Sequence, residues 1–149
     1  MAGEIAEYLK THFGLQNISG DDVKTIESIF SEQGFEKDEI IFREGEPGDR
    51  MFFIREGLVK VYLREIEKGK TIALIKKGEL VGELSFFDNG PHSAEAMALT
   101  KTDAYVLNLD RFNGMKKTNP GLALEITDIV LKVVSARLRG TTRKMYGIY

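Results

Sequence analysis

The chain has 149 residues, an apolar fraction of 42%, a charged fraction of 30% and a formal net charge of −2. This balance fits one soluble globular domain, and it excludes a strong global field that would draw the protein to nucleic acid or to an anionic membrane. Disulfides and thiol chemistry are excluded because the sequence has no cysteine. No apolar run approaches the ~20 residues of a membrane span and no signal-peptide pattern opens the chain, so we expect a cytoplasmic protein without a membrane segment.

The first part of the chain, about residues 1–34, is predicted to be a helical lead-in. "EIAEYL" is a short candidate helix. A second helix is predicted from Ser19 to Gly34, because Ser19 is a suitable N-cap, Asp22 follows at the spacing of a capping box and Gly34 is a suitable stop. Apolar residues recur on one face of this second helix: Val23, Ile26, Ile29 and Phe30.

The pattern changes near residue 38, and short strands are predicted over about residues 38–110. Glycines separate short apolar runs, which include "EIIF", "MFFI", "LVKVYL", "TIALI", "AEAMAL" and "AYVLNL". Short strands with turn signals at this spacing predict an antiparallel β-sandwich or β-barrel of about eight strands. "EKGK" is predicted to form a hairpin tip, with Gly69 in the turn.

Helices are predicted again over about residues 111–140. "DRFNGMKK" fits a short connector, and a long helix is expected between Pro120 at its first turn and Gly140 at its end. One apolar stripe on this helix is expected to face its own domain: Leu122, Ile126, Ile129, Val130 and Val133. A second stripe has heptad-like spacing: Leu124, Leu131, Val134 and Leu138. The second stripe predicts a homodimer through this helix; the alternative is that both stripes are buried in one broad contact.

The stretch "GELSFFDNGPHSAEAMA", residues 82–98, carries the candidate site. Gly82 lets another group approach the backbone closely, and Glu83 is favoured at a helix start by the helix dipole. Ser93 offers a hydroxyl group. Each of these residues has a purely structural explanation when it is taken alone, since a first-turn carboxylate or a strand hydroxyl needs no ligand. Their combination predicts a pocket for an anionic ligand, or the remains of one.

The order of these elements and several motifs resemble the cyclic nucleotide-binding domain family, over roughly residues 20–140. "FREGEPGDRMFFIREGLVKVYL" is similar to the opening strands of that family, and "KKGELVGELSFF" to the approach to its phosphate-binding cassette. "NPGLALEI" is similar to the start of its C-terminal helix. The resemblance implies a mainly β domain, a jelly roll of about eight strands with N-terminal helices and a long C-terminal helix, within a single domain spanning residues 1–149.

The resemblance also implies a role for each cassette residue. Gly82 would offer its amide to the ligand, and Glu83 would accept a hydrogen bond from the ribose 2′-hydroxyl. Leu84 and Ser85 would begin a short helix whose amides point at the phosphate, and Ser93 would add a hydroxyl and an amide. The implied ligand is a cyclic nucleotide, cAMP or cGMP, or another anion, and no cofactor is required.

Two residues depart from the family pattern. His92 stands where the family has its phosphate-binding arginine, and loss of one charge-assisted hydrogen bond would weaken binding by roughly ten- to a hundredfold. A protonated His92 would restore part of this, so pH-sensitive binding is one expectation; the alternative is a polar turn residue that faces water. Glu95 adds a negative charge, which opposes an anionic ligand if it points inward and is a solvated strand residue if it points outward.

The sequence leaves two functions in contention. One is a ligand-sensing regulatory module that binds a cyclic nucleotide weakly, and the other is a degenerate domain that serves only protein contacts or dimerisation. The segment after Gly140 is too short for a recognition helix, so no DNA-binding domain is expected and output would pass through an unknown protein partner. Basic residues near the helix end complement its dipole: Arg137, Arg139, Arg143 and Lys144.

An enzyme is not expected. The two histidines, His12 and His92, are far apart in the chain, and no cluster of metal ligands is evident. His92 and Ser93 are expected to be neighbours on a strand, where side chains point to opposite faces and cannot pair as base and nucleophile.

Overall fold

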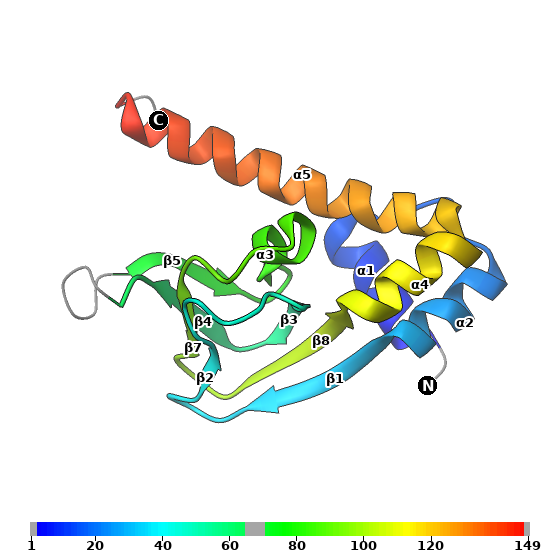
Figure 1. Ribbon diagram of the computed structural model, residues 1–149, viewed down its shortest axis with the longest axis horizontal. Coiled ribbons are helices and arrows are strands. Elements are labelled where there is room, and N and C mark those ends of the chain that lie inside the picture. The colour runs from blue at the N-terminus through cyan, green and yellow to red at the C-terminus, as the bar shows by residue number, and fades with distance from the viewer. Residues whose placement is uncertain (1–2, 65–70, 148–149) are drawn as a thin grey trace.

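The computed structural model describes residues 3–64 and 71–147, and these ranges form eight strands between helices at both ends (Figure 1). The predicted hairpin tip "EKGK" lies outside the described residues. The helices are α1 (Glu4–Phe13), α2 (Gly20–Ile29), α3 (Glu83–Asp88), α4 (Leu109–Thr118) and α5 (Pro120–Met145). The strands are β1 (Phe30–Phe35), β2 (Ile40–Phe42), β3 (Arg50–Glu56), β4 (Leu58–Tyr62), β5 (Thr71–Lys76), β6 (Leu80–Val81), β7 (Glu95–Ala98) and β8 (Thr102–Asn108).

The strands form two four-stranded antiparallel sheets, in the orders β1-β8-β3-β6 and β2-β7-β4-β5. The predicted mainly β jelly roll with flanking helices is therefore confirmed, although the two sheets stay open and do not close into a barrel. A core cluster lies between the sheets, and small residues at its centre let the sheets approach: Ala96 and Ala98 of β7 and Ala104 of β8. Aromatic rings from β1, β2 and β3 fill the rest, with Phe52 beside Phe35 and Phe42.

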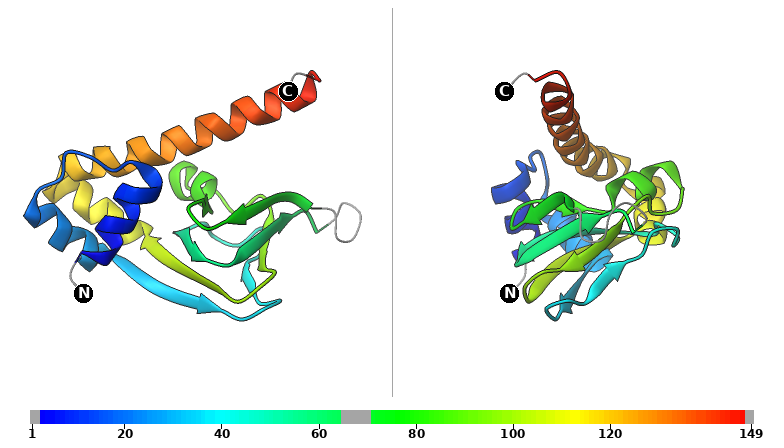
Figure 2. Two further views of the ribbon diagram at one scale, coloured as in Figure 1. Left: turned by 180° about the vertical axis from the view of Figure 1, so that it is seen from behind. Right: turned by 90° about the vertical axis from the view of Figure 1, so that its left-hand side faces the viewer.

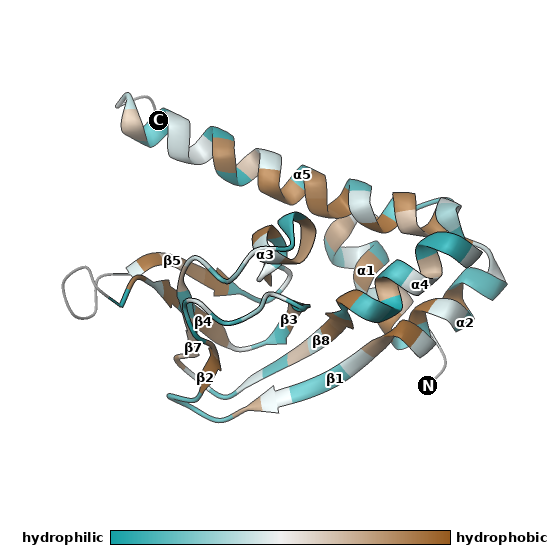
Figure 3. Ribbon diagram, in the orientation of Figure 1, coloured by the Kyte–Doolittle hydropathy of each residue, from teal (hydrophilic) through white to brown (hydrophobic). Residues whose placement is uncertain are grey.

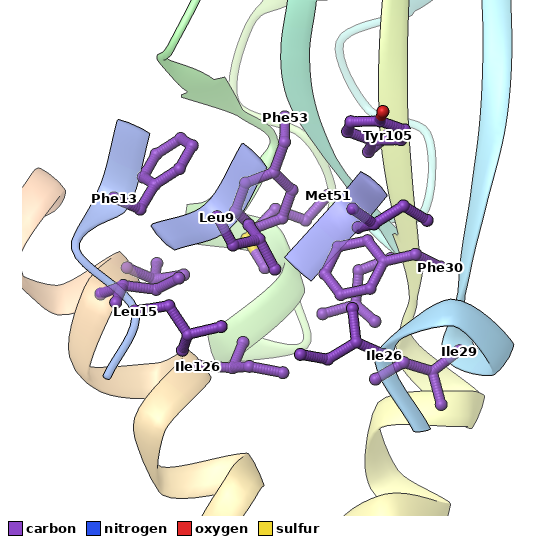
Figure 4. Packing of buried hydrophobic residues seen from close by; sticks show 14 of the residues in the cluster. Leu9, Phe13, Leu15, Ile26, Ile29, Phe30, Met51, Phe53, Tyr105 and Ile126 are labelled. Carbon is purple, nitrogen blue, oxygen red and sulfur yellow. The ribbon is translucent and has the colours of Figure 1, made fainter. Parts of the chain in front are cut away.

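A second and larger core joins the helices to the outer face of the first sheet (Figure 4). The cluster includes Leu9 and Phe13 of α1, Ile26 of α2, Ile126 of α5 and Phe53 of β3, and the ring of Phe13 packs edge-on against that of Phe53. This cluster fixes α5 against the domain, so the position of the long helix depends on the same packing that holds the strands.

The N-terminal lead-in differs from the prediction in one respect. The capping box is present, since the Ser19 side chain accepts from the Asp22 amide and the Asp22 side chain accepts from the Ser19 amide. The helix nevertheless ends at Ile29 and not at Gly34, because residues 30–35 pair with β8 along their whole length. Phe30 and Phe35 are buried at the two ends of this strand, so tertiary pairing overrides the local helical pattern.

The long helix also differs from the prediction at its end. Pro120 stands at its first turn as expected, but the helix continues through Gly140 to Met145. Nothing lies within 4 Å of a side chain built at Gly140, and the residue is exposed, so it remains in the helix at a cost of about 1 kcal/mol relative to alanine. Figures 1 and 2 show this C-terminal half of α5 running past α3 and away from the end of the molecule at which α1, α2 and α4 gather.

Within the described ranges, no helix is both long enough and apolar enough to cross a membrane.

Candidate functional site

The cassette residues form one wall of a small pocket between the second sheet, α3 and α5. Its cavity volume is about 130 Å³. The floor is apolar, and it comprises Phe42, Val61, Ala73, Ile75 and Val81. The polar side chains along it belong to Glu83, Ser85, His92, Ser93 and Arg137. The residues that the sequence placed in the cassette are thus brought together with one residue from the far end of the chain.

Gly82 occupies a backbone conformation that favours glycine. Its φ is 89°, and a side chain there would place its first carbon 3.0 Å from the Arg50 carbonyl oxygen. This left-handed residue ends β6 and starts α3, so that the next residue, Glu83, turns back toward the pocket. The predicted arrangement of residues 82–98 as helix, turn and strand is present as α3 followed by β7.

Glu83 is buried, and its carboxylate is held by a cation from α5. The Arg137 Nη1 donates to Glu83 Oε1 at 2.6 Å, and Nη2 donates to the Leu80 carbonyl oxygen. Arg137 therefore ties α5 to α3 and to β6 at the pocket edge. Sequence interpretation assigned Arg137 to the helix dipole and missed this role. The available signal was its place four residues after Val133, on the stripe of α5 that faces the domain.

His92 is buried and does not face water, which excludes the expectation of a solvated turn residue. Its exposed fraction is 6%, and its ring stacks on Phe42 with the centroids 3.7 Å apart. Its Nδ1 lies 2.8 Å from the Ser85 hydroxyl oxygen. The backbone of His92 is fixed as well, because its amide donates to the Glu46 carbonyl and its carbonyl accepts from the Gly45 amide.

Ser85 reaches His92 because a glycine opposite leaves room for it. A side-chain carbon built at Gly48 would lie 2.0 Å from the Ser85 hydroxyl oxygen, so no larger residue fits there without movement. Ser85 is 4% exposed. The expectation that His92 and Ser93 lie next to each other on a strand is wrong, because β7 begins only at Glu95. His92 is paired with Ser85 of α3 instead.

The charge state of His92 follows from its surroundings. Burial lowers the pKa of His92 below its usual value; the carboxylates of Glu46 and Asp49 raise this pKa, and the Arg50 guanidinium lowers it. The direction that results is downward, so the imidazole is neutral at pH 7 in the unliganded protein. With Arg137 already paired to Glu83, the lining residues within the described ranges carry no uncompensated positive charge.

The remaining cassette residues are more exposed. Ser93 is exposed on the pocket rim, and Leu84 points largely to solvent with 57% of its surface accessible. Glu95 is 2% exposed, which contradicts the favoured expectation of a solvated strand residue. It accepts a hydrogen bond from the Tyr62 hydroxyl at 3.1 Å, and the Arg64 Nε lies 3.4 Å from its other oxygen. Glu95 is absent from the residues that line the pocket, and the cation near its carboxylate is Arg64, which follows β4.

A second, larger groove lies on the other side of α3, against α5. Its volume is about 410 Å³, and its lining is largely apolar: Leu84 and Phe87 of α3 with Val130, Leu131 and Val134 of α5. Leu84 and Glu83 line both this groove and the smaller pocket. Any molecule that fills the groove would therefore contact the helix that carries the cassette.

The comparisons with known proteins agree with this geometry. Residues 32–119 match the model of the cyclic nucleotide-binding domain. The CRP-like cAMP-activated global transcriptional regulator of Mycobacterium tuberculosis is 31% identical over 74% of this chain and 48% of its own length. The cAMP-dependent protein kinase regulatory subunit of Candida albicans is 27% identical over 70% of this chain and 22% of its own. The chain thus spans about half, or less, of these two relatives.

Among solved structures, a cyclic nucleotide-binding domain from Methylobacillus flagellatus KT superposes with a TM-score of 0.86. It is 27% identical in sequence, and the match covers 98% of this chain and 85% of that one. The matched region includes every strand after β1 as well as α3, so every lining residue of the pocket except Arg137 lies within the part of the chain that the family model describes. This chain belongs to the cyclic nucleotide-binding domain family.

Proposed function

We propose that this chain is a ligand-sensing regulatory module that binds a cyclic nucleotide, cAMP or cGMP, in the pocket between α3, the second sheet and α5. The buried Glu83 carboxylate on the pocket wall carries the proposal, because an acceptor held there suits a ribose hydroxyl. The relative from Mycobacterium tuberculosis is named as cAMP-activated, which supports the same ligand class. The protein acts in regulation, without catalysis of its own, and in the cytoplasm.

Binding is expected to be weak, since His92 stands where a phosphate-binding arginine would supply a fixed charge. A neutral imidazole offers one donor, whereas a guanidinium offers a fork that matches two phosphate oxygens. The loss is roughly ten- to a hundredfold in affinity. In this proposal Gly82, Leu84, Ser85, His92 and Ser93 contact the ligand together with Glu83.

Arg137 connects the pocket to α5, because it lies on α5 and pairs with Glu83 on the pocket wall. The pocket encloses about 130 Å³, whereas pockets that bury a small-molecule ligand enclose roughly 300–1,000 Å³. A nucleotide therefore requires the pocket to widen, and the Arg137 side chain is the part of the pocket wall that α5 contributes. We propose that the ligand competes with Arg137 for Glu83, so that α5 moves when the pocket is filled.

The protein is proposed to work as a homodimer through α5. Leu124, Leu131 and Leu138 are each about 60% exposed on α5, which removes the alternative that both apolar stripes are buried in one contact. These residues recur every seven positions, as at a helix–helix seam. Figure 3 shows hydrophobic stretches recurring along α5. Val134 is half-buried against the protomer's own core, so it supports the groove beside the seam. An unknown protein partner would carry the output.

The second candidate is a degenerate domain that binds no nucleotide and serves protein contacts alone. The specific observation in its favour is that the Glu83–Arg137 pair and a neutral, stacked His92 leave a cavity smaller than a nucleotide pocket. In this case the glycines and the cassette residues would be needed only for folding.

Thermal unfolding with and without cAMP or cGMP separates the two candidates. A ligand that binds the native state stabilises it by about 2.7 kcal/mol at a hundredfold excess over Kd. We expect a rise in Tm that saturates with cyclic nucleotide and is absent with non-cyclic AMP at equal ionic strength. No rise with either cyclic nucleotide at millimolar concentration would favour the degenerate domain.

A further inference from the structure

The contact between Ser85 and His92 has a property that the proposed function does not use. The two side chains are buried, 2.8 Å apart, and the ring is held between Phe42 on one side and the cassette on the other. A serine hydroxyl can both donate and accept, whereas Nδ1 of histidine accepts when it is unprotonated and donates when it is protonated. This pair can therefore remain hydrogen-bonded in either charge state of the ring.

In the neutral ring with its proton on Nε2, the Ser85 hydroxyl donates to Nδ1. Nε2 is then the nitrogen that remains for a group in the pocket. In the charged state, Nδ1–H donates to the Ser85 oxygen, and the Ser85 hydrogen turns to the Gly82 carbonyl oxygen, which lies 3.4 Å from the hydroxyl oxygen. No buried donor is left unpaired by the change, so protonation needs no movement of the backbone.

The charges around His92 determine when it takes up the proton. Glu46 and Asp49 face the ring from the loop between β2 and β3, and Arg50 opposes them from β3. Within the pocket, Glu83 and Arg137 neutralise each other. An anionic ligand beside His92 would add a negative charge near the ring, and it would stabilise the imidazolium.

We propose that an anionic ligand enters this pocket together with one proton, which His92 takes up, and that Ser85 is the positioning residue that keeps the ring hydrogen-bonded in both charge states. This inference rests on the proposed function, because it requires an anion in the pocket. Its consequence is that affinity depends on pH even though the ligand's own charge does not change near neutrality. The pocket would respond to ligand and acidity together.

The direction of the pH effect follows from the two states of His92. In the free protein burial holds the pKa of His92 below its usual value, and a bound anion raises this pKa. Between the two values the complex holds one more proton than the free protein, so affinity rises as the pH falls through this window. Below the pKa of the free protein both forms are protonated, and the dependence on pH disappears.

Calorimetric titration with cAMP in two buffers of different ionisation enthalpy, at about pH 7, counts the protons taken up on binding. The wild type is expected to take up protons on binding, up to one per ligand, and His92→Gln close to none. His12→Gln is the matched control, because His12 lies on α1, outside this pocket, and the proton count should stay that of the wild type. Ser85→Ala is expected to lower the uptake and to move the pH at which affinity changes downward, since Nδ1–H of the imidazolium would lose its acceptor.

The outcomes separate the inference from the function on which it rests. Binding of cAMP by the wild type without proton uptake would overturn the inference and leave the proposed function intact. Equal uptake by the wild type and by Ser85→Ala, with the same pH profile, would overturn the role of Ser85. Absence of binding heat in both the wild type and His92→Arg, with cAMP and with cGMP, would overturn the proposed function and the inference with it.

Discussion

At the scale of single residues, the cassette depends on close approaches that only glycine permits. Gly48 is the strictest case, because a side chain there would overlap the Ser85 hydroxyl and its Cβ. Gly82 is a second case, because its positive φ places Glu83 on the pocket wall. The positions of Ser85, His92 and Glu83 therefore follow from backbone geometry as much as from their own side chains.

Gly48→Ala is predicted to destabilise the fold by about 1–3 kcal/mol, which is typical of overpacking in a filled core. The reason is that α3 must move away from the loop between β2 and β3. This movement also separates Ser85 from His92. Gly140→Ala is the matched control: it lies in an exposed part of α5 with nothing within 4 Å, and it should stabilise by about 0.4–1 kcal/mol. Urea unfolding of both variants measures the difference, and equal stabilities would contradict this account of the cassette.

Residue-level prediction from sequence succeeded where chemistry and spacing are local. The capping box at Ser19, the cassette helix after Gly82 and the proline at the start of α5 are all local signals. The partners of His92 could not be predicted, because Ser85 meets it only through the fold of the cassette and Phe42 comes from β2. Arg137 pairs with a residue 54 positions away; its place on the domain-facing stripe of α5 indicates that it faces the domain but does not identify Glu83 as its partner.

At the scale of elements, α3 and α5 are the two helices that connect the ligand pocket with the rest of the domain. α3 has the pocket on one side and the apolar groove on the other, and α5 contributes to both. The polar link between them is the Arg137 guanidinium, and the apolar link is the contact of Val130 and Val134 with the core. Elements with one strong local pattern were predicted well. Most of residues 30–35 was predicted to belong to the second helix, but this segment forms β1 because it pairs with β8.

Leu131→Glu is predicted to dissociate the proposed homodimer, since a charge at the centre of the seam would have to be buried in an apolar interface. Leu131 is 59% exposed in the isolated protomer, so the change should leave protomer stability within about 0.5 kcal/mol. Lys132→Glu is a control at the adjacent exposed position, outside the leucine repeat. Light scattering should give a dimer for the wild type and the control and a monomer for Leu131→Glu. A monomeric wild type at tens of micromolar, above a ~1 μM Kd, would contradict the proposal.

At the scale of the whole molecule, the two hydrophobic cores have different roles. The cluster between the sheets shapes the pocket floor, through Phe42, Ile75 and Val81, and the larger cluster holds α5 across the end of the domain. Mainly β architecture with flanking helices was predictable because glycine spacing and the change of period are distributed along the chain. The openness of the sheets was not predictable, because closure depends on which edges pair, and that is set by packing between distant strands.

The central claim is that a cyclic nucleotide binds beside Glu83 with an anchor weakened by His92, and titration calorimetry of the wild type, His92→Arg and Glu83→Ala with cAMP and cGMP tests it most directly. The account predicts measurable binding by the wild type, affinity roughly ten- to a hundredfold higher for His92→Arg, and weaker binding for Glu83→Ala. Arg139→Lys, on the exposed side of α5, should bind as the wild type does. Failure of His92→Arg to bind either nucleotide, in a protein that remains folded, would contradict the claim and leave a domain kept for protein contacts.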